Sequence, residues 1–342
     1  MDKKSKFNSV SEKDFLHELS LLHHEGIIYE KIAKTISVFF NTYKQALTEQ
    51  GKSIDEHVPI FFDFLECIKR QIESPFSFEN YNKKISHPFD YHKFGINFFK
   101  PLVKESSSYL VGKEHVKEIE SLLEKKENVI LLGNHQIEPD PQALFILLQK
   151  ESPKLIDHLI FVAGERVITD PVAVPFSLGC NLLCIYSKRY IDNPPEKKGE
   201  KQFYNNKTMK MMKSLLDSGG CCIYVAPSGG RDRKDENGRV YPAPFDPQSI
   251  EMFHLIGRHS LQPTHFFPLA LATYSLLPPP ETIQKELGET RTATASSIRI
   301  AFGKKINMDQ FPGCTEEDKA LRRKAKSDYI YNMVCSMYEQ LS

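Results

Sequence analysis

The segment Gly133-Asn-His-Gln-Ile-Glu-Pro-Asp-Pro141 carries a histidine and an aspartate five residues apart, directly after an apolar run. Across a turn, Asp140 can accept a hydrogen bond from one imidazole nitrogen of His135 and fix its tautomer. The other nitrogen is then able to take a proton from an alcohol. This pair is the base and orienting acid of a triad, and it requires no nucleophile from the protein. A structural interpretation stays open beside it, because Asp140 and Pro141 also suit the N-cap and first position of a helix.

A second polar segment, Ala226-Pro-Ser-Gly-Gly-Arg-Asp-Arg233, also follows an apolar run. Its two glycines let backbone N–H groups turn toward an anion. Arg231 and Arg233 offer forked donors that match phosphate oxygens, and their alternation places both on one side of an extended loop. The alternative is an arginine-rich surface turn paired with nearby aspartates. The segment is neither a P-loop nor a nucleophile elbow, since both signatures are absent.

A third polar segment, Tyr186-Ser-Lys-Arg-Tyr190, follows another apolar run. Lys188 and Arg189 could complete a phosphate pocket, or they could be ordinary solvated charges. The histidines outside the first segment lack acidic or cysteine partners at ligand spacing, and a metal site needs three or four ligands. We therefore expect no metal ion and no other cofactor.

The elements that must position these segments can be predicted from hydrophobic patterning. From about residue 88, short β-branched runs alternate with helical stretches, which predicts an α/β fold with a mixed, mostly parallel sheet flanked by helices. Ligands of such sheets bind at the carboxyl ends of the strands, where the polar segments fall. Pro268 inside an apolar run predicts a bulge or a sheet edge. The predicted strands are 128–132, 159–163, 182–186, 222–226, 265–271 and 297–302, and the predicted helices are 141–150, 202–218, 247–258 and one from 315.

The first ~80 residues show helical periodicity instead. Apolar residues recur at spacings of three and four from Ile28 to Leu47 and again from Ile60 to Ile72, and an earlier helix is expected at 12–24. We therefore predict a helical bundle domain at 1–82 that precedes an α/β catalytic domain at 83–342.

Composition excludes several classes of protein. The 342 residues carry a net charge of +1, and 40% are hydrophobic, which predicts a folded chain that binds no nucleic acid. The apolar runs reach only seven residues, too short to span a bilayer, so at most peripheral membrane contact is expected. The N-terminus resembles neither a secretory signal nor a transit peptide, which predicts a cytoplasmic protein with reduced cysteines.

In this order, these segments resemble those of the glycerol-3-phosphate acyltransferase family, and in particular the soluble plastid-type enzymes. The resemblance covers roughly residues 85–305. Its blocks are Pro88–Tyr91, Gly133–Pro141, Phe161–Arg166 with Thr169–Pro171, Asn181–Lys188, Ala226–Arg233 and Ala243–Asp246, with Pro268-Leu269 similar to a short final block of the wider superfamily.

The resemblance implies that His135 and Asp140 are the catalytic pair and that Arg231 and Arg233 bind glycerol-3-phosphate. Lys188 and Arg189 fall on the family's basic block after Tyr-Ser, which commonly continues Lys-Lys-His, whereas this chain has tyrosine at 190. Tyrosine keeps a hydrogen-bonding group but supplies no cation near neutral pH. The resemblance also implies acyl transfer to the sn-1 hydroxyl, from acyl carrier protein or a CoA thioester. The short N-terminus favours a bacterial-type cytosolic setting over a plastid precursor.

Two alternatives belong to other functional classes. One is a hydrolase in which Ser228 is the nucleophile, with His135 and Asp140 behind it, although the elbow motif is missing. The other is a non-catalytic protein that binds a phosphoester or a lipid.

Overall fold

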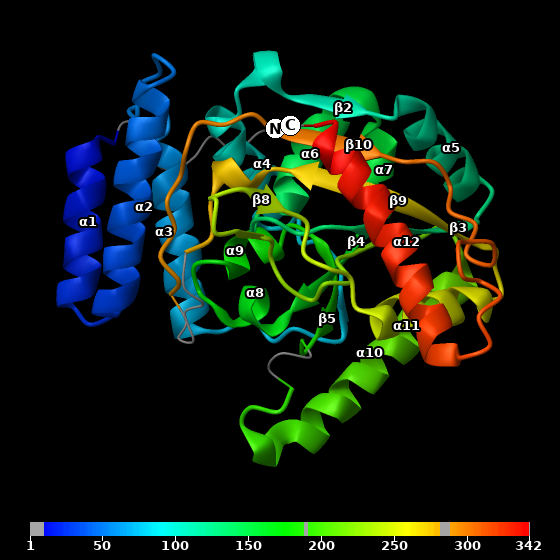
Figure 1. Cartoon of the computed structure of the whole chain (residues 1–342). Helices are drawn as coiled ribbons and strands as arrows, with labels where there is room; N and C mark the ends of the chain where they lie inside the picture. The colour runs from blue at the N-terminus through cyan, green and yellow to red at the C-terminus, as the bar shows by residue number, and fades with distance from the viewer. Residues whose placement is uncertain (1–9, 188–190, 281–287, 342) are drawn as a thin grey trace.

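The computed structural model describes residues 10–187, 191–280 and 288–341. Three N-terminal helices stand beside an α/β layer built on one large sheet (Figure 1). These helices are α1 (Glu12–His24), α2 (Glu30–Thr48) and α3 (Val58–Glu73). The helices expected from the apolar spacing of the first ~80 residues are therefore confirmed.

The three helices pack through aromatic side chains. The rings of Phe15 and Phe40 stack with centroids 4.6 Å apart, and Phe61 meets Phe40 edge-on at 4.9 Å. The same apolar cluster runs on into the α/β layer, where the hydroxyl of Tyr43 donates to the carbonyl of Phe98 over 2.7 Å. The helices are thus fastened to the layer by buried contacts, and the domain boundary at 82/83 stays a prediction.

The main sheet has the strand order β1-β5-β4-β6-β3-β9-β10-β2. Only the β1–β5 and β9–β10 pairs are antiparallel, and the other pairs of this sheet are parallel. This confirms the mixed, mostly parallel sheet. Its strands are β1 (Tyr81–Asn82), β2 (Tyr109–Val111), β3 (Asn128–Gly133), β4 (Leu159–Gly164), β5 (Asn181–Ile185), β6 (Cys222–Val225), β9 (Thr264–Ala272) and β10 (Arg299–Phe302), and β7 (Arg233–Lys234) pairs separately with β8 (Val240–Tyr241).

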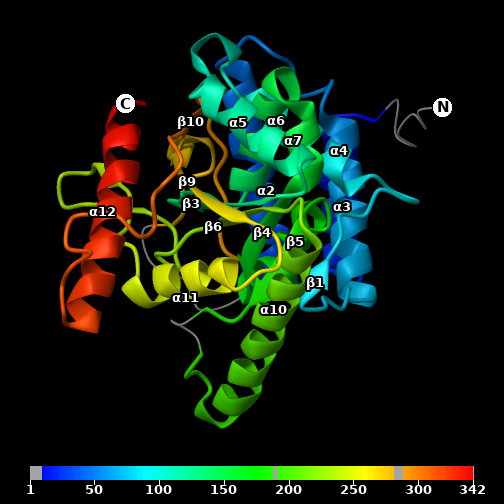
Figure 2. The ribbon, with the colours of Figure 1, turned by 90° about the vertical axis from the view of Figure 1, so that its right-hand side faces the viewer.

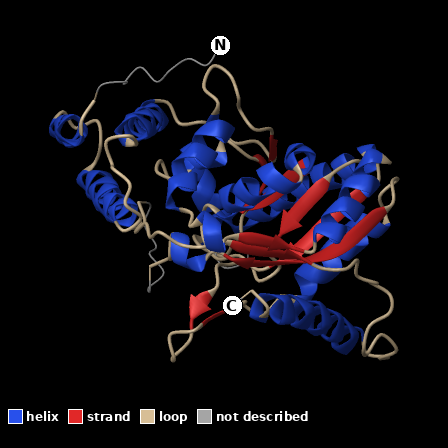
Figure 3. Cartoon of the chain, turned by 90° about the horizontal axis from the view of Figure 1, so that it is seen from above, coloured by secondary structure: helices blue, strands red, loops and turns tan. Residues whose placement is uncertain are grey.

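Helices cover both faces of the sheet (Figure 3). Successive side chains of β3 explain how, because alternate residues of a strand point to opposite faces. Val129 and Leu131 join the cluster under α5 and α6, whereas Ile130 and Leu132 join the cluster under α10, α11 and α12. The helices of the layer are α4 (Tyr91–Phe99), α5 (Lys113–Glu124), α6 (Asp140–Glu151), α7 (Pro153–His158), α8 (Glu165–Thr169), α9 (Val174–Ser177), α10 (Lys198–Ser218), α11 (Pro247–Arg258) and α12 (Lys319–Glu339).

The long helix α10 extends at one end well beyond the rest of the molecule (Figure 2). The terminal helix α12 begins at Lys319, four residues later than expected from 315, because the side chain of Asp318 caps its first turn. Among the described residues, no helix combines the length and the apolar character that a membrane-spanning segment needs.

The expectation of a sheet edge at Pro268 is wrong, whereas the expectation of a bulge is confirmed in the strand that pairs with it. β9 is continuous and lies between β3 and β10, with Pro268 opposite Leu132. The carbonyl of Pro268 accepts from the N–H of Gly303, one residue past the end of β10. Antiparallel pairing resumes at Phe266 and Ile306 with one extra residue on the partner side, so the missing N–H of Pro268 falls where the ladder is interrupted.

Candidate active site

Four neighbouring parallel strands, β4, β6, β3 and β9, end at the same edge of the sheet. The loop with His135 follows β3, and the loop with Arg231 follows β6. Gly133 closes β3 at a point where a side chain has no room, because an added Cβ would lie 2.8 Å from the Leu269 carbonyl. The close approach of β3 to β9 therefore fixes where the His135 loop leaves the sheet.

His135 and Asp140 meet across that loop. The Nδ1 atom of His135 lies 2.7 Å from Oδ2 of Asp140, and the aspartate is buried while 29% of the histidine side chain is exposed. Across the described part of the chain, no hydrogen bond forms at the Nε2 atom of His135. An imidazole whose Nδ1 is engaged by a carboxylate has its Nε2 available as a base.

The carboxylate of Asp140 is held on both oxygens. Its Oδ2 also accepts from the backbone N–H groups of Gln136 (2.7 Å) and Ile137 (3.3 Å), and its Oδ1 accepts from the hydroxyl of Thr273 (2.5 Å). The N-cap interpretation of Asp140 is wrong in detail: α6 begins at Asp140 itself, after Pro139, and no side chain caps it. The carboxylate faces back into the His135 loop.

The residues on either side of His135 fasten the loop to β9. The side chain of Asn134 exchanges two hydrogen bonds with the backbone of Leu271, at 2.8 and 2.9 Å. The Oε1 atom of Gln136 accepts from the backbone N–H groups of Thr273 (2.6 Å) and Tyr274 (2.9 Å). These contacts fix the backbone position of the histidine between them.

Asp232 joins the loop after β6 to the same place. Its backbone N–H donates to the His135 carbonyl over 2.6 Å, and its Oδ2 accepts from the side-chain amides of Asn134 (2.8 Å) and Gln136 (3.2 Å). Its Oδ1 accepts from the N–H of Ala243. Burial raises the pKa of Asp232 to about 6, against the opposing effect of these hydrogen bonds. The two loops are therefore one hydrogen-bonded unit.

Arg231 and Arg233 point away from Asp232, toward the connection between β9 and β10. Nη2 of Arg231 lies 2.7 and 2.9 Å from the two carboxylate oxygens of Glu289, and Arg233 donates to the carbonyl of Pro280. Arg231 is mostly buried, with 14% of its side chain exposed. Both guanidinium groups thus contact residues of the connection between β9 and β10.

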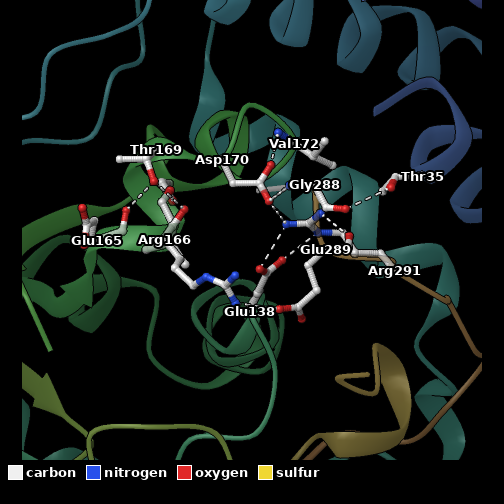
Figure 4. A network of polar contacts seen from close by, with 12 residues as sticks. Thr35, Glu138, Glu165, Arg166, Thr169, Asp170, Val172, Gly288, Glu289 and Arg291 are labelled. Atoms are coloured by element: carbon white, nitrogen blue, oxygen red, sulfur yellow. Dashed lines mark hydrogen bonds and ion pairs between the residues drawn. The ribbon is translucent and has the colours of Figure 1, made fainter. Parts of the chain in front are cut away.

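A buried network holds that segment in place (Figure 4). Arg291 donates to both oxygens of Glu138 at 2.8 and 3.1 Å, to Asp170 at 3.1 Å and to the Glu289 carbonyl at 2.7 Å. The Arg291 guanidinium holds the pKa of the Asp170 carboxyl below its usual range, against the opposing effect of burial. Because Glu138 belongs to the His135 loop, the network links that loop to Glu289 and through it to Arg231.

Lys188, Arg189 and Tyr190 lie outside the described residues, and their predicted part in a phosphate pocket stays a prediction. The strand before them is well fixed: Tyr186 exchanges backbone hydrogen bonds of 2.8 Å with the side chain of Asn205 on α10. In the sequence they follow β5, the neighbour of β4.

Sequence reasoning missed several polar residues of this site. Thr273 directly follows the β9 strand, so the rule that polar residues gather after strand ends could have found it. Glu289 and Arg291 stand in a stretch without hydrophobic periodicity, and no local signal marks them as buried.

Comparison with known proteins decides the family. A model of the family described as Acyltransferase matches residues 110–271. Glycerol-3-phosphate acyltransferase ATS12, chloroplastic, from Cucurbita moschata is 34% identical over 97% of this chain and 72% of its own length. The chloroplastic glycerol-3-phosphate acyltransferases of Arabidopsis thaliana and Spinacia oleracea are each 33% identical, over 97% and 98% of this chain and 73% and 71% of theirs. The chain belongs to the glycerol-3-phosphate acyltransferase family. The resemblance found in the sequence is confirmed.

In this glycerol-3-phosphate acyltransferase family member, the residues that match the family model include β3, β4, β5, β6 and nearly all of β9. They also include the loops that carry His135 and Arg231. The crystal structure of the 1-acyl-sn-glycerophosphate acyltransferase PlsC from Thermotoga maritima overlaps with a TM-score of 0.41 at 15% identity, covering 96% of this chain and 94% of that one. An overlap this loose has no bearing on function.

Proposed function

We propose that this member of the family transfers a fatty acyl group from an acyl thioester to the sn-1 hydroxyl of glycerol-3-phosphate, with His135 as general base. The observation that supports this best is the His135–Asp140 pair, 2.7 Å apart, on a loop that Asp232 joins to the loop with Arg231 and Arg233. A base and two anion-binding side chains thus belong to one rigid unit.

In the proposed reaction, Nε2 of His135 takes the proton of the sn-1 hydroxyl as its oxygen attacks the thioester carbonyl. Asp140 stabilises the imidazolium through Nδ1–H. The tetrahedral intermediate collapses, the carbon–sulfur bond breaks, and the thiolate leaves with the proton from His135. The products are 1-acylglycerol-3-phosphate and the free thiol. Base catalysis of this kind contributes roughly 10²–10⁴-fold.

Arg231 and Arg233 bind the phosphate in this proposal, and Lys188 and Arg189 complete the pocket from the loop after β5. Anchoring the phosphate holds the hydroxyl beside His135, so the arginines contribute by orientation as well as affinity. The donor we propose is acyl carrier protein, with a CoA thioester as the alternative, and the proposed setting is the cytoplasm. The named relatives are chloroplastic enzymes.

The hydrolase alternative needs Ser228 next to a base. In the structure the hydroxyl of Ser228 donates to the carbonyl of Gly230, two residues on, over 3.0 Å. A serine nucleophile is activated by a hydrogen bond to its base, and here that proton is used within the turn. This contact favours direct transfer, in which the substrate hydroxyl is the nucleophile.

The test supplies labelled acyl groups on acyl carrier protein and on CoA, with glycerol-3-phosphate present or omitted. We expect labelled 1-acylglycerol-3-phosphate only when glycerol-3-phosphate is present. Acid-quenched protein should carry no label, and Ser228→Ala should retain activity. Label bound covalently at Ser228 would establish the hydrolase-type mechanism instead. Binding of glycerol-3-phosphate without any transfer would indicate a non-catalytic protein.

A further inference from the structure

Two guanidinium groups converge on one buried carboxylate at the proposed phosphate site. Only 7% of the Glu289 side chain is exposed. Arg231 reaches both of its oxygens, and Nη1 of Arg166, from α8 after β4, lies 3.3 Å from Oε2. Glu289 is thus the anion that these two arginines hold in this structure.

The backbone around Glu289 is fixed on both sides (Figure 4). Its own carbonyl accepts from Arg291. The preceding residue, Gly288, donates its N–H to Asp170 at 3.0 Å and accepts from the hydroxyl of Thr35 on α2 at 3.2 Å. Because the backbone is held in place, displacement of Glu289 from the arginines requires rotation of its side chain about its own bonds.

We propose that Glu289 is an internal competitor for the phosphate of the substrate, and that Arg166 is a further phosphate-binding residue beside Arg231. This inference rests on the proposed function. A carboxylate and a phosphate use the same donors of a guanidinium, and a phosphate monoester carries nearly two negative charges and three acceptor oxygens. The phosphate displaces the carboxylate because it offers two guanidinium groups more charge and more acceptors.

An internal competitor has a measurable consequence. The apparent affinity for substrate is reduced by the fraction of molecules in which Glu289 has left the arginines. A dianion then displaces Glu289 from the arginines, whereas a neutral molecule does not. The carboxylate therefore favours binding of phosphorylated glycerol over unphosphorylated glycerol. A purely positioning role predicts the opposite sign, since loss of the carboxylate would let Arg231 swing out of place and weaken binding.

The decisive variant is Glu289→Gln, which keeps the size of the side chain and removes its charge. Calorimetric titration of the protein with glycerol-3-phosphate and with inorganic phosphate, without acyl donor, gives dissociation constants independent of turnover. We expect both constants to fall by about three- to tenfold, and the KM for glycerol-3-phosphate to fall with them at unchanged kcat. Dissociation constants that rise or stay the same overturn the competitor role.

Two further variants control this result. Glu251→Gln removes another partly buried carboxylate from an ion pair, with Lys326 at 2.8 Å between α11 and α12, and should leave both dissociation constants unchanged. Glu289→Asp retains the charge but draws it back by one methylene, so it should tighten phosphate binding less than glutamine does. It provides the same test if the glutamine variant does not fold. Weaker binding in both Glu289 variants overturns the proposal.

The role of Arg166 is tested in the wild type and in the Glu289→Gln variant. Arg166→Ala should raise the dissociation constant for glycerol-3-phosphate by about tenfold in the wild type and by a similar factor in Glu289→Gln. If the effect disappears in the Glu289→Gln background, Arg166 serves only to neutralise Glu289, and that part of the proposal is wrong.

Failure of this inference and failure of the proposed function give different results. If the proposed function is wrong, the wild type does not bind glycerol-3-phosphate, or Arg231→Ala has no effect on binding. If only the inference is wrong, the wild type binds it and Arg231→Ala weakens binding, but Glu289→Gln does not strengthen it.

Discussion

Replacing Asp140 with asparagine separates the charge of this residue from its geometry. Three donors converge on Oδ2, namely Nδ1–H of His135 and the N–H groups of Gln136 and Ile137, whereas Oδ1 faces the hydroxyl of Thr273. An asparagine fits this site in one orientation, with its oxygen toward the two N–H groups and its amide toward the hydroxyl, which can rotate to accept. The histidine therefore keeps its tautomer in Asp140→Asn.

What the variant loses is the charge that stabilises the imidazolium. A hydrogen bond to a charged group contributes about 1.5–3 kcal/mol, against about 0.5–1.5 kcal/mol for a neutral one. The difference is about 1–1.5 kcal/mol, and with about 1.36 kcal/mol per factor of ten in rate it predicts a fall in kcat of about 5- to 13-fold. The KM for glycerol-3-phosphate should change little, because Asp140 does not touch Arg231 or Arg233, the residues proposed to bind the phosphate.

The assay is the initial rate of acyl transfer with both substrates saturating, on protein shown to be folded by circular dichroism and thermal unfolding. Thr273→Val is the matched control, since it removes a donor to the same carboxylate and leaves the charge, and it should lower kcat less than Asp140→Asn does. A change below threefold in Asp140→Asn would refute the role of the charge. A loss near 10⁴-fold would show that the tautomer is lost as well, contrary to the geometry argued from the two N–H groups.

Three further predictions concern substrate binding and stability. Arg231→Ala and Arg233→Ala should each raise the KM for glycerol-3-phosphate by about 10- to 100-fold with little effect on kcat, and an unchanged KM in both would contradict the phosphate role. Burial raises the pKa of Asp63 on α3 to about 6, above its value in the unfolded chain. The charged carboxylate therefore destabilises the fold at pH 7. This destabilisation is lost as the carboxyl protonates, while the pH falls from about 6 toward 4. Asp63→Asn should therefore raise the free energy of unfolding by about 1–2 kcal/mol at pH 7 and by only about 0.2–0.4 kcal/mol at pH 4. Urea titrations at the two pH values measure this, and equal gains at both would contradict the sign. Tyr43→Phe leaves the Phe98 carbonyl without its donor and should lower the free energy of unfolding by about 1–3 kcal/mol, whereas a value within error of the wild type would mean that this contact does not fasten α2 to the layer.

The sequence predicts the sheet well because each central strand is an apolar run that is buried on both faces. β3, β4 and β6 have all but a few of their residues buried, and their bounds were predicted to within a residue. The strands that sequence reasoning missed, β1, β2, β7 and β8, have two or three residues each, too few to show a period. α5 was missed although Val116, Ile119 and Leu123 are buried at helical spacing.

The site was predictable where it depends on neighbours in sequence and unpredictable where it depends on the fold. His135 and Asp140 are close in the chain, so a turn suffices to bring them together. Glu289 reaches Arg231 from 58 residues away, and Arg291 reaches Glu138 from 153. No property of the stretch from 288 to 297 indicates that its charged side chains pair inside the protein, since only the arrangement of strand ends decides which charges meet.

The most direct test of the account is the acyl-transfer rate of His135→Gln under saturating acyl donor and glycerol-3-phosphate, with binding of glycerol-3-phosphate measured in parallel by calorimetry. We predict that kcat falls by about 10²–10⁴-fold while the dissociation constant for glycerol-3-phosphate stays within a factor of three. A variant that transfers acyl groups at the rate of the wild type would contradict the assignment of His135 as the base.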